Sequence, residues 1–286
     1  MLGAAARGGG LAIAAAAGAA SAGCSGLIGS MAADTLSAAI LEQEDPALIE
    51  AGAPAYLLLL DGFISRNPDD AALLAAGAQL YALYGSRFAP DGERAIELTA
   101  KARRYGTRAM CIGYAWACSG ELGDYETYVE QLSRVTRRDV DLLYAYAVSW
   151  LSHLDATSED WTAVAELPWV EAALERVLEL DETHAQGAVH GYLGTLNALR
   201  PPALGGRPEV ARQHFERAIE LSGGRDLSVK VEYARRYARL VFDQELHDRL
   251  LREVLEAPTD ARGLTLFNAL AKEEAGRLLA TSEDYF

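Results

Sequence analysis

Motifs for metal binding and for covalent catalysis are missing from this sequence. It has 3 cysteines and 5 histidines, and none of them is spaced like the ligands of a zinc site. No H-E-x-x-H, P-loop, G-x-S-x-G or G-x-G-x-x-G motif occurs. We therefore predict no enzyme activity, no catalytic residue, no metal and no cofactor. An all-helical hydrolase built on Glu171, Glu175 and Glu179 is an alternative, but carboxylates at this spacing are typical of a solvated helix face.

Positive charge, strand-forming runs and long apolar segments are also scarce. There are 26 Lys and Arg against 41 Asp and Glu, and the net charge of −15 disfavours nucleic acid and anionic membrane surfaces as partners. Outside the N-terminus no run of about eighteen residues is uninterruptedly apolar, so we expect no internal membrane span. Alanine and leucine dominate over β-branched residues, and 50% of the chain is hydrophobic. This composition predicts an all-α fold with a sizeable core.

A packing phrase recurs along the chain. The sequence Glu-Arg-Ala-Ile-Glu-Leu occurs at residues 93–98 and again at 216–221, and a looser copy occupies 175–180. Arg176 and Arg217, in neighbouring copies, are 41 residues apart. A tetratricopeptide (TPR) unit has about 34 residues, and an insertion such as 201–206 accounts for the longer spacing. We predict a TPR-like helical-repeat array, with an unrelated helical bundle as the alternative.

Helix boundaries can be assigned around this phrase. Residues 168–180, about 184–198 and 208–221 are expected to form helices, and Gly187, Gly191 and Gly194 in the second one predict the close approach of a neighbouring helix. Asp45-Pro46 starts a helix that residues 52–54 should interrupt. Residues 55–65 are apolar almost all round, which indicates full burial or the wall of an apolar cavity. The polar segment 155–167 is expected to be a long loop.

The N-terminus indicates export. A short apolar run follows Arg7 and ends in small residues before Cys24, as in a bacterial lipoprotein signal. We predict a signal peptide over residues 1–23, lipid attachment at Cys24, a tether over 24–30 and an all-helical domain over 31–286. Ser21 stands where a bacterial lipoprotein signal usually has leucine. The alternative is ordinary signal cleavage after residues 20–22, which would release a soluble protein. Ser25 after the cysteine favours the outer membrane.

The other two cysteines are separated by seven positions. On one straight helix Cys111 and Cys118 would lie about 10.5 Å apart along the axis, beyond the roughly 7 Å that a disulfide spans. We therefore expect two buried thiols. A break of the helix at Gly113 is the condition under which they would bond.

Aromatic side chains are the other conspicuous feature. Many occupy helix positions expected to face inward, where they form a core or line an apolar groove or channel inside the array. The candidate channel residues are Tyr56, Leu58, Tyr81, Tyr84, Trp116, Trp150 and Tyr192. The histidines, including His184 and His190, are scattered and are interpreted as polar or capping residues rather than ligands.

Several longer phrases resemble a known family. They are Cys24 with its preceding small residues, residues 52–62 (GAPAYLLLLDG), 192–194 (YLG), 201–208 (PPALGGRP), 221–224 (LSGG) and the closing 284–286 (DYF). Together they resemble the T-component lipoproteins of TRAP transporters. The resemblance spans almost the whole chain. It implies a TPR-like protomer that can form a trimer, with an apolar channel and no catalytic motif.

The resemblance also implies a function. The chain would be a periplasmic, membrane-anchored lipoprotein that scaffolds the solute-binding P-component of a TRAP system. The lipid would be its contact with the membrane. A hydrophobic or organic-acid ligand would bind in or pass through the channel. The alternative is a generic TPR adaptor lipoprotein in envelope assembly, which would bind a peptide or protein in its concave face.

Overall fold

The computed structural model of the chain describes residue 35 and residues 37–89, 91–119, 123–199, 202 and 205–286. The expected signal peptide over 1–23, the lipid site Cys24 and the tether over 24–30 lie outside these residues. Within the described part there are helices and no strand, so the predicted all-α class is confirmed.

The described helices follow one another with short connections. The α-helices are α2 (Pro46–Arg66), α3 (Ala71–Arg87), α4 (Gly92–Gly113), α5 (Tyr125–Ser133), α6 (Val140–Ala156), α7 (Trp161–Val164), α8 (Leu167–Leu180), α9 (Ala188–Ala198), α10 (Pro208–Leu221), α11 (Leu227–Glu232), α12 (Gln244–Glu256), α13 (Thr265–Ala280) and α14 (Ser282–Tyr285). Short 3₁₀ turns occupy Ala115–Cys118, Arg137–Asp139 and His184–Gly187, and a π-helical turn, η5, occupies Tyr233–Ala238.

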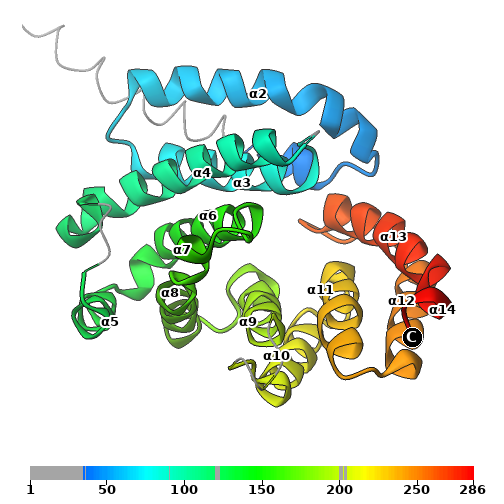
Figure 1. Cartoon of the computed structure of the whole chain (residues 1–286). Coiled ribbons are helices and arrows are strands. Elements are labelled where there is room, and N and C mark those ends of the chain that lie inside the picture. The colour runs from blue at the N-terminus through cyan, green and yellow to red at the C-terminus, as the bar shows by residue number, and fades with distance from the viewer. Residues whose placement is uncertain (1–34, 36, 90, 120–122, 200–201, 203–204) are drawn as a thin grey trace, which may run out of the picture.

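The helices form an arc that closes on itself. Figure 1 shows α2 to α4 along one side, α6, α8 and α9 down the next, and α11 to α13 returning to the start. The closure is made by Glu42, whose carboxylate accepts hydrogen bonds from the Gly263 amide at 2.7 Å and from the Thr265 hydroxyl at 3.2 Å. Leu266 of α13 also packs in the same apolar cluster as Leu73 of α3. Side chains on the inner faces of distant helices therefore point toward one another.

The recurring phrase has the same geometry in each copy. Its arginine pairs with the glutamate three residues later, at 2.7 Å for Arg94–Glu97, 2.7 Å for Arg176–Glu179 and 2.6 Å for Arg217–Glu220. The copies lie on α4, α8 and α10, each of which packs against its successor or predecessor in the arc. This arrangement is compatible with the predicted TPR-like superhelix.

Helix α2 is continuous where an interruption was expected. Pro54 lies inside the helix, and a proline has no N–H to bond the carbonyl four residues before it, here that of Glu50. The hydroxyl of Tyr84 on α3 donates a hydrogen bond to this carbonyl at 3.3 Å. The neighbouring helix thus supplies the donor that proline removes, and the expected break at residues 52–54 is wrong.

The glycines of α9 bring helices together as predicted. A Cβ on Gly194 would lie 2.9 Å from the ring of Phe215 on α10, and one on Gly187 would lie 2.7 Å from Leu221. The helix begins later than expected, however. Ala185 and Gln186 have φ of 48° and 57°, and Gly187 has φ of 83°, so α9 proper starts at Ala188. The predicted start at His184 is corrected accordingly.

Cys111 and Cys118 form a disulfide, which corrects the expectation of two buried thiols. Helix α4 ends at Gly113, and Tyr114 takes an extended conformation with φ of −139° and ψ of 99°. The chain therefore turns back, and the two Cα atoms lie 4.7 Å apart. The straight-helix distance did not apply because the helix ends between the two residues.

The polar segment before α8 is more ordered than expected. Asp160 accepts a hydrogen bond from the amide of Thr162 at 2.8 Å and caps the short helix α7. The predicted long loop over residues 155–167 is therefore partly wrong. Trp161 at the start of α7 is 85% exposed.

Candidate functional site

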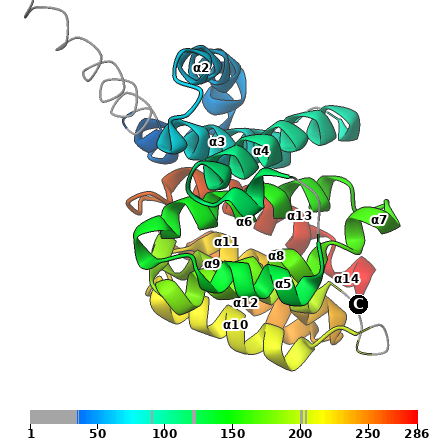
Figure 2. The ribbon, with the colours of Figure 1, turned by 90° about the vertical axis from the view of Figure 1, so that its left-hand side faces the viewer.

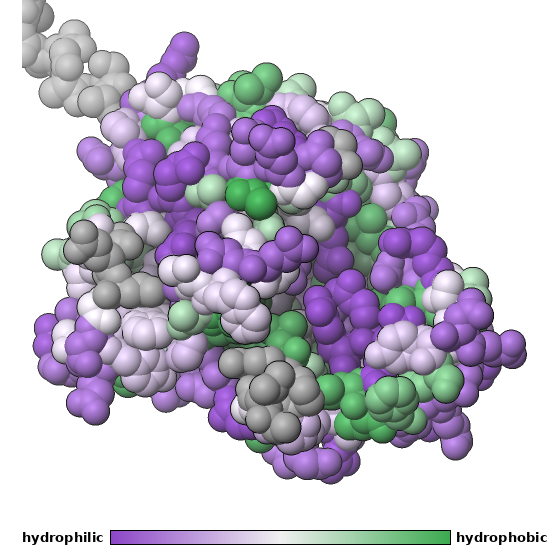
Figure 3. Space-filling view, viewed as in Figure 1, coloured by the Kyte–Doolittle hydropathy of each residue, from purple (hydrophilic) through white to green (hydrophobic). Residues whose placement is uncertain are grey.

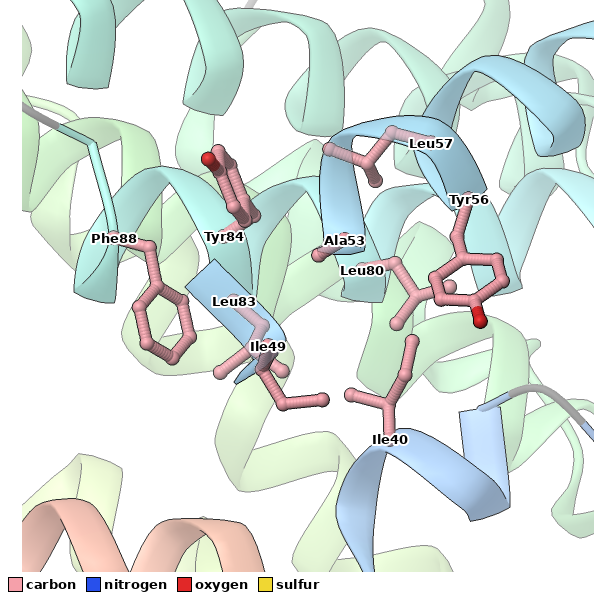
Figure 4. A pocket seen from close by; sticks show the side chains of 9 residues that line it. All are labelled: Ile40, Ile49, Ala53, Tyr56, Leu57, Leu80, Leu83, Tyr84 and Phe88. Carbon is pink, nitrogen blue, oxygen red and sulfur yellow. The ribbon is translucent and has the colours of Figure 1, made fainter. Parts of the chain in front are cut away.

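An apolar pocket opens between α2 and α3. Figure 4 shows its lining, which consists of Ile40, Ile49, Ala53, Tyr56, Leu57, Leu80, Leu83, Tyr84 and Phe88. It contains about 270 Å³ of unfilled space, part of it open to solvent. Because part of that space is open solvent, it is not the volume of an enclosed ligand cavity, and the pocket is a shallow apolar depression. Two channel candidates, Tyr56 and Tyr84, meet here.

The outer side of α2 is an exposed apolar face. Leu58 is 71% exposed and Leu59 is 50% exposed, whereas Leu57 and Leu60 are buried against α3. Residues 55–65 are therefore not fully buried: Tyr56 and Leu57 line the apolar pocket, as the second expectation had it, and the outer side of the segment faces solvent. Figures 2 and 3 show α2 at the edge of the molecule, with hydrophobic residues reaching the surface there. By length and composition α2 is also apolar enough to cross a membrane, the one such helix in the described residues.

Tyr81 belongs to a polar network beneath this helix. Asp61 of α2 accepts hydrogen bonds from the hydroxyls of Tyr81 at 2.8 Å and Tyr105 at 2.7 Å, and from Lys101 Nζ at 2.5 Å. Burial of Asp61 opposes its ionisation, but the hydrogen bonds from Lys101 and the tyrosines outweigh it and hold the pKa of Asp61 below its usual range. The network joins α2, α3 and α4, so Tyr81 has a structural role in this position.

Two further candidates lie in the core around α6. Trp150 is 1% exposed, and its indole Nε1 donates a hydrogen bond to Glu166 at 2.7 Å. The guanidinium of Arg103 lies 4.9 Å from the centre of the Trp150 ring. Trp116 packs edge-on against Tyr128 and Tyr146 at 5.6 and 6.2 Å. These contacts place both tryptophans in one packed cluster, separate from the pocket at α2.

Tyr192 lies with Tyr144 on the inner side of the arc. Their ring centres are 6.4 Å apart, and the Tyr144 ring meets His184 at 4.8 Å. Burial, and next the neighbouring Tyr192, raise the pKa of Tyr144 well above its usual value. Charged groups from α3 and α11, Arg87 and Glu232, act on Tyr192. The helices that carry these groups are far apart in the sequence, so this is a point where the inner faces converge.

A second feature of the interior is a cluster of charged side chains. We call it the interior charge cluster, and its members are Arg87, Asp155, Glu232, Arg235, Arg236 and Glu274. They come from α3, α6, α11, η5 and α13. Figure 3 shows polar and charged residues gathered around a hollow in the middle of this face of the molecule. The candidate site is therefore this interior region rather than the apolar residues of α2.

Glu232 is at the centre of the cluster. Its carboxylate accepts hydrogen bonds from Arg235, three residues on, and from Nε of Arg236 at 3.4 Å. Burial of Glu232 opposes ionisation, but the charges of Arg235, Arg236 and Arg87 prevail and hold its pKa below the usual value. The glutamate is thus ionised at neutral pH and holds the two arginines in place.

The sequence analysis named Tyr192 as a channel candidate, but it did not predict the charged residues of this cluster. Arg235 and Arg236 are two ordinary cations of a helix when considered locally. Their partners Asp155 and Glu274 are at positions that no repeat phrase or motif marks. The π-helical turn that carries the arginines was equally unmarked, although such turns are frequent at functional sites.

The histidines are less scattered than the sequence indicated. Nδ1 of His190 on α9 lies 2.8 Å from Nδ1 of His214 on α10, and Nε2 of His190 lies 3.3 Å from Glu182. Across the described residues no group of three or more His, Cys, Asp or Glu side chains is arranged to hold a metal ion. The histidine pair is a contact between two helices.

These features define a class of protein: an all-helical, closed repeat array with a charged and aromatic interior. A family model described as TRAP transporter T-component matches residues 42–286. The chain therefore belongs to the TRAP transporter T-component family, as its phrases indicated. Membership of this family associates the chain with a TRAP transporter, as an accessory component at the cell envelope.

A curated relative supports the extent of the match. It is a protein of Treponema pallidum (strain Nichols), described as an uncharacterized protein, and is 24% identical over 267 residues. The alignment covers 86% of this chain and 81% of the relative. The similarity thus extends over most of both chains.

Proposed function

We propose that this protein is a non-enzymatic, lipid-anchored periplasmic subunit that scaffolds the solute-binding P-component of a TRAP-type uptake system. The observation that carries the proposal is the family match over residues 42–286. A lipid on Cys24 would keep the array beside the membrane. Tethering of a solute-binding partner there would raise its effective concentration near the transporter.

The cysteines support export and lipid attachment. The chain has 3 cysteines, and Cys111 and Cys118 are bonded to each other. Disulfides persist in oxidising compartments such as the periplasm. This pairing leaves Cys24 as the odd thiol, and lipid attachment would consume it. The outer membrane is the favoured location because Ser25 follows Cys24.

The exposed face of α2 supports contact with another protein. Leu48, Leu58 and Leu59 are each at least half exposed, at 54%, 71% and 50%. Apolar patches of this kind mark interaction sites. A homo-oligomer, a trimer by family resemblance, is part of the proposal. Sedimentation of the purified chain should give a mass above that of one 30.7 kDa protomer.

The ligand part of the proposal uses the interior of the arc. Of the channel candidates, Tyr192 packs against Tyr144, whereas Leu58 lies on the outer surface of α2. We propose that a hydrophobic or organic-acid ligand is held or passed on the inner side. Polar substitution of Leu58 should then affect partner or subunit contact more than ligand uptake.

The partner is tested by native pull-down from envelope extract, with mass spectrometry of the co-purifying proteins. A periplasmic solute-binding protein in stoichiometric amount is the expected result. Recovery of envelope-assembly proteins or peptides without a solute-binding protein would favour the generic TPR adaptor instead.

The anchor is tested separately by labelling with a fatty-acid analogue. Cys24→Ser should lose the label and leave the membrane fraction. The variant Cys111→Ser/Cys118→Ser is the matched control and should keep the label. A labelled Cys24→Ser chain would contradict lipid attachment at this residue.

A further inference from the structure

Three consecutive residues between α8 and α9 have a left-handed backbone. The φ angles of Ala185, Gln186 and Gly187 are 48°, 57° and 83°. This conformation is unfavourable for residues that carry a Cβ atom. Among the described residues, Phe242 is the one other non-glycine residue with a positive φ, and it stands alone. Strained residues persist where the surrounding structure fixes them, and they cluster at switch regions. The left-handed turn therefore requires an explanation.

Side-chain burial does not account for this turn, since its alanine is exposed and its glutamine is only half-buried. The segments on both sides are instead fixed to α10. Glu182 accepts hydrogen bonds from Nε and Nη2 of Arg217 at 2.8 and 3.0 Å. Gly187 lies so close to α10 that a Cβ on it would be 2.7 Å from Leu221. Residues 183–186 thus form a short span between two fixed points.

The glutamine of the turn reaches a distant loop. Nε2 of Gln186 donates a hydrogen bond to the carbonyl of Arg262 at 3.2 Å, across 76 positions of the sequence. We call residues 259–265, which lead from α12 into the first residue of α13, the strap. Its other side is held by Glu42, through the two hydrogen bonds that close the array. The strap therefore connects the start of the array with the left-handed turn in its middle.

Few apolar contacts reinforce the seam at the strap. Of α13, Leu266 and the half-buried Leu270 pack in the cluster that contains α2, α3 and α4. The other buried hydrophobic residues of α13, namely Ala271, Ala275 and Leu278, pack with α10, α11 and α12. A segment held mainly by a few hydrogen bonds opens more readily than a packed core. The seam is thus the place where the closed array opens most easily.

We propose that the strap opens as a unit and that the left-handed turn favours this opening. When the bond between Gln186 and Arg262 breaks, residues 183–186 are released from one of their contacts and relax toward right-handed φ. The strain that closure imposes on the turn is then relieved. Opening of the strap exposes the inner side of the arc between α9 and α13. The proposal rests on the fold and requires neither the anchor, the partner nor a bound ligand.

The first test removes the bond between the turn and the strap. Gln186→Met keeps the length of the side chain but has no N–H to donate. Hydrogen-exchange mass spectrometry of the purified full chain should show about two- to tenfold faster exchange of the strap amides. The faster exchange should extend to residues 263–265, where the bonds to Glu42 are made. Gln213→Met, at an exposed glutamine of α10, is the matched control and should leave the strap unchanged.

Two outcomes of this test overturn the proposal. One is unchanged exchange throughout the strap of a folded Gln186→Met chain. The other is faster exchange confined to residues 184–187, which would mean that the strap does not open as a unit. Circular dichroism shows whether each variant retains the helical content of the unmodified chain.

The second test relieves the strain without touching the strap. Glycine accepts the φ of 48° at position 185 without a steric cost. In Ala185→Gly the closed state is therefore favoured, and the strap amides should exchange about threefold more slowly. Ala165→Gly is the control, because Ala165 is exposed and has an ordinary φ of −65°. It should leave strap exchange unchanged. Equal or faster strap exchange in Ala185→Gly overturns the role of the turn, and neither test depends on the pull-down.

Discussion

Gly194 sets how closely α9 and α10 pack. A Cβ at this position would lie 2.9 Å from the ring of Phe215, which is completely buried and stacks on Tyr233 at 5.0 Å. The ring cannot move aside without disturbing that stack. Gly194→Ala should therefore lower the free energy of unfolding by about 1–3 kcal/mol. Chemical denaturation measures the change.

Gly276→Ala is the control for this prediction. Gly276 also lies within a helix, but a Cβ there meets no atom within 4 Å. Alanine should raise stability by about 0.5–1 kcal/mol because it favours the helix. If both substitutions stabilise the protein, the close approach at Gly194 is not a constraint.

The histidine pair makes stability depend on pH. Burial, then the charges of His190 and Arg207, lower the pKa of His214 to about 4. Burial lowers that of His190, although Glu182 opposes the shift. Unfolded histidine titrates near pH 6.5, so between about pH 4 and 6.5 the unfolded chain binds more protons. The contribution of these two histidines to the free energy of unfolding is fully present above pH 6.5 and is lost as the pH falls below it.

His214→Asn should flatten this dependence. The measurement is the free energy of unfolding at intervals between pH 4 and 7. We expect a shallower slope below pH 6.5 than in the unmodified chain, because one proton-binding difference is gone. An unchanged slope would show that other groups control the acid sensitivity.

At the scale of elements, α2 depends on its neighbour for continuity. The Tyr84 hydroxyl donates to the Glu50 carbonyl, which the missing N–H of Pro54 leaves without its helical partner. Tyr84→Phe should cost about 0.5–1.5 kcal/mol. In the Pro54→Ala background residue 54 supplies the N–H, so the same change should cost less. A double-mutant cycle by denaturation measures the difference, and strictly additive effects would contradict the coupling.

The helix ends also show which features of the fold could be predicted from the sequence. Asp45, Asp70 and Asp124 each accept hydrogen bonds from the amides of the first turn that follows, which is a local signal. The continuity of α2 was missed because its supporting hydroxyl comes from another helix. The Cys111–Cys118 disulfide was missed because the assumption of a straight helix failed at Gly113.

For the whole molecule, Glu42 joins the two ends of the array. It accepts hydrogen bonds from Gly263 and Thr265, at the start of α13. Glu42→Ala should speed hydrogen exchange in residues 263–266 and leave α8 and α9 unchanged, because the opening is local. Hydrogen-exchange mass spectrometry measures this.

Glu44→Ala is the matched control. Glu44 is an exposed acid two residues away, and its side chain is not part of the closure. It should exchange like the unmodified chain. Faster exchange throughout Glu42→Ala would instead mean that closure stabilises the entire array.

The sequence by itself determined the helical class, most helix starts, the repeat phrase and the family. These depend on composition, capping and periodicity, which act between residues close along the chain. Only the tertiary structure decided that Asp155, Glu232, Arg235, Arg236 and Glu274 come together from α6, α11, η5 and α13. Their proximity follows from the curvature and closure of the array. Curvature accumulates over many helix contacts, so no local pattern encodes which inward side chains finally meet.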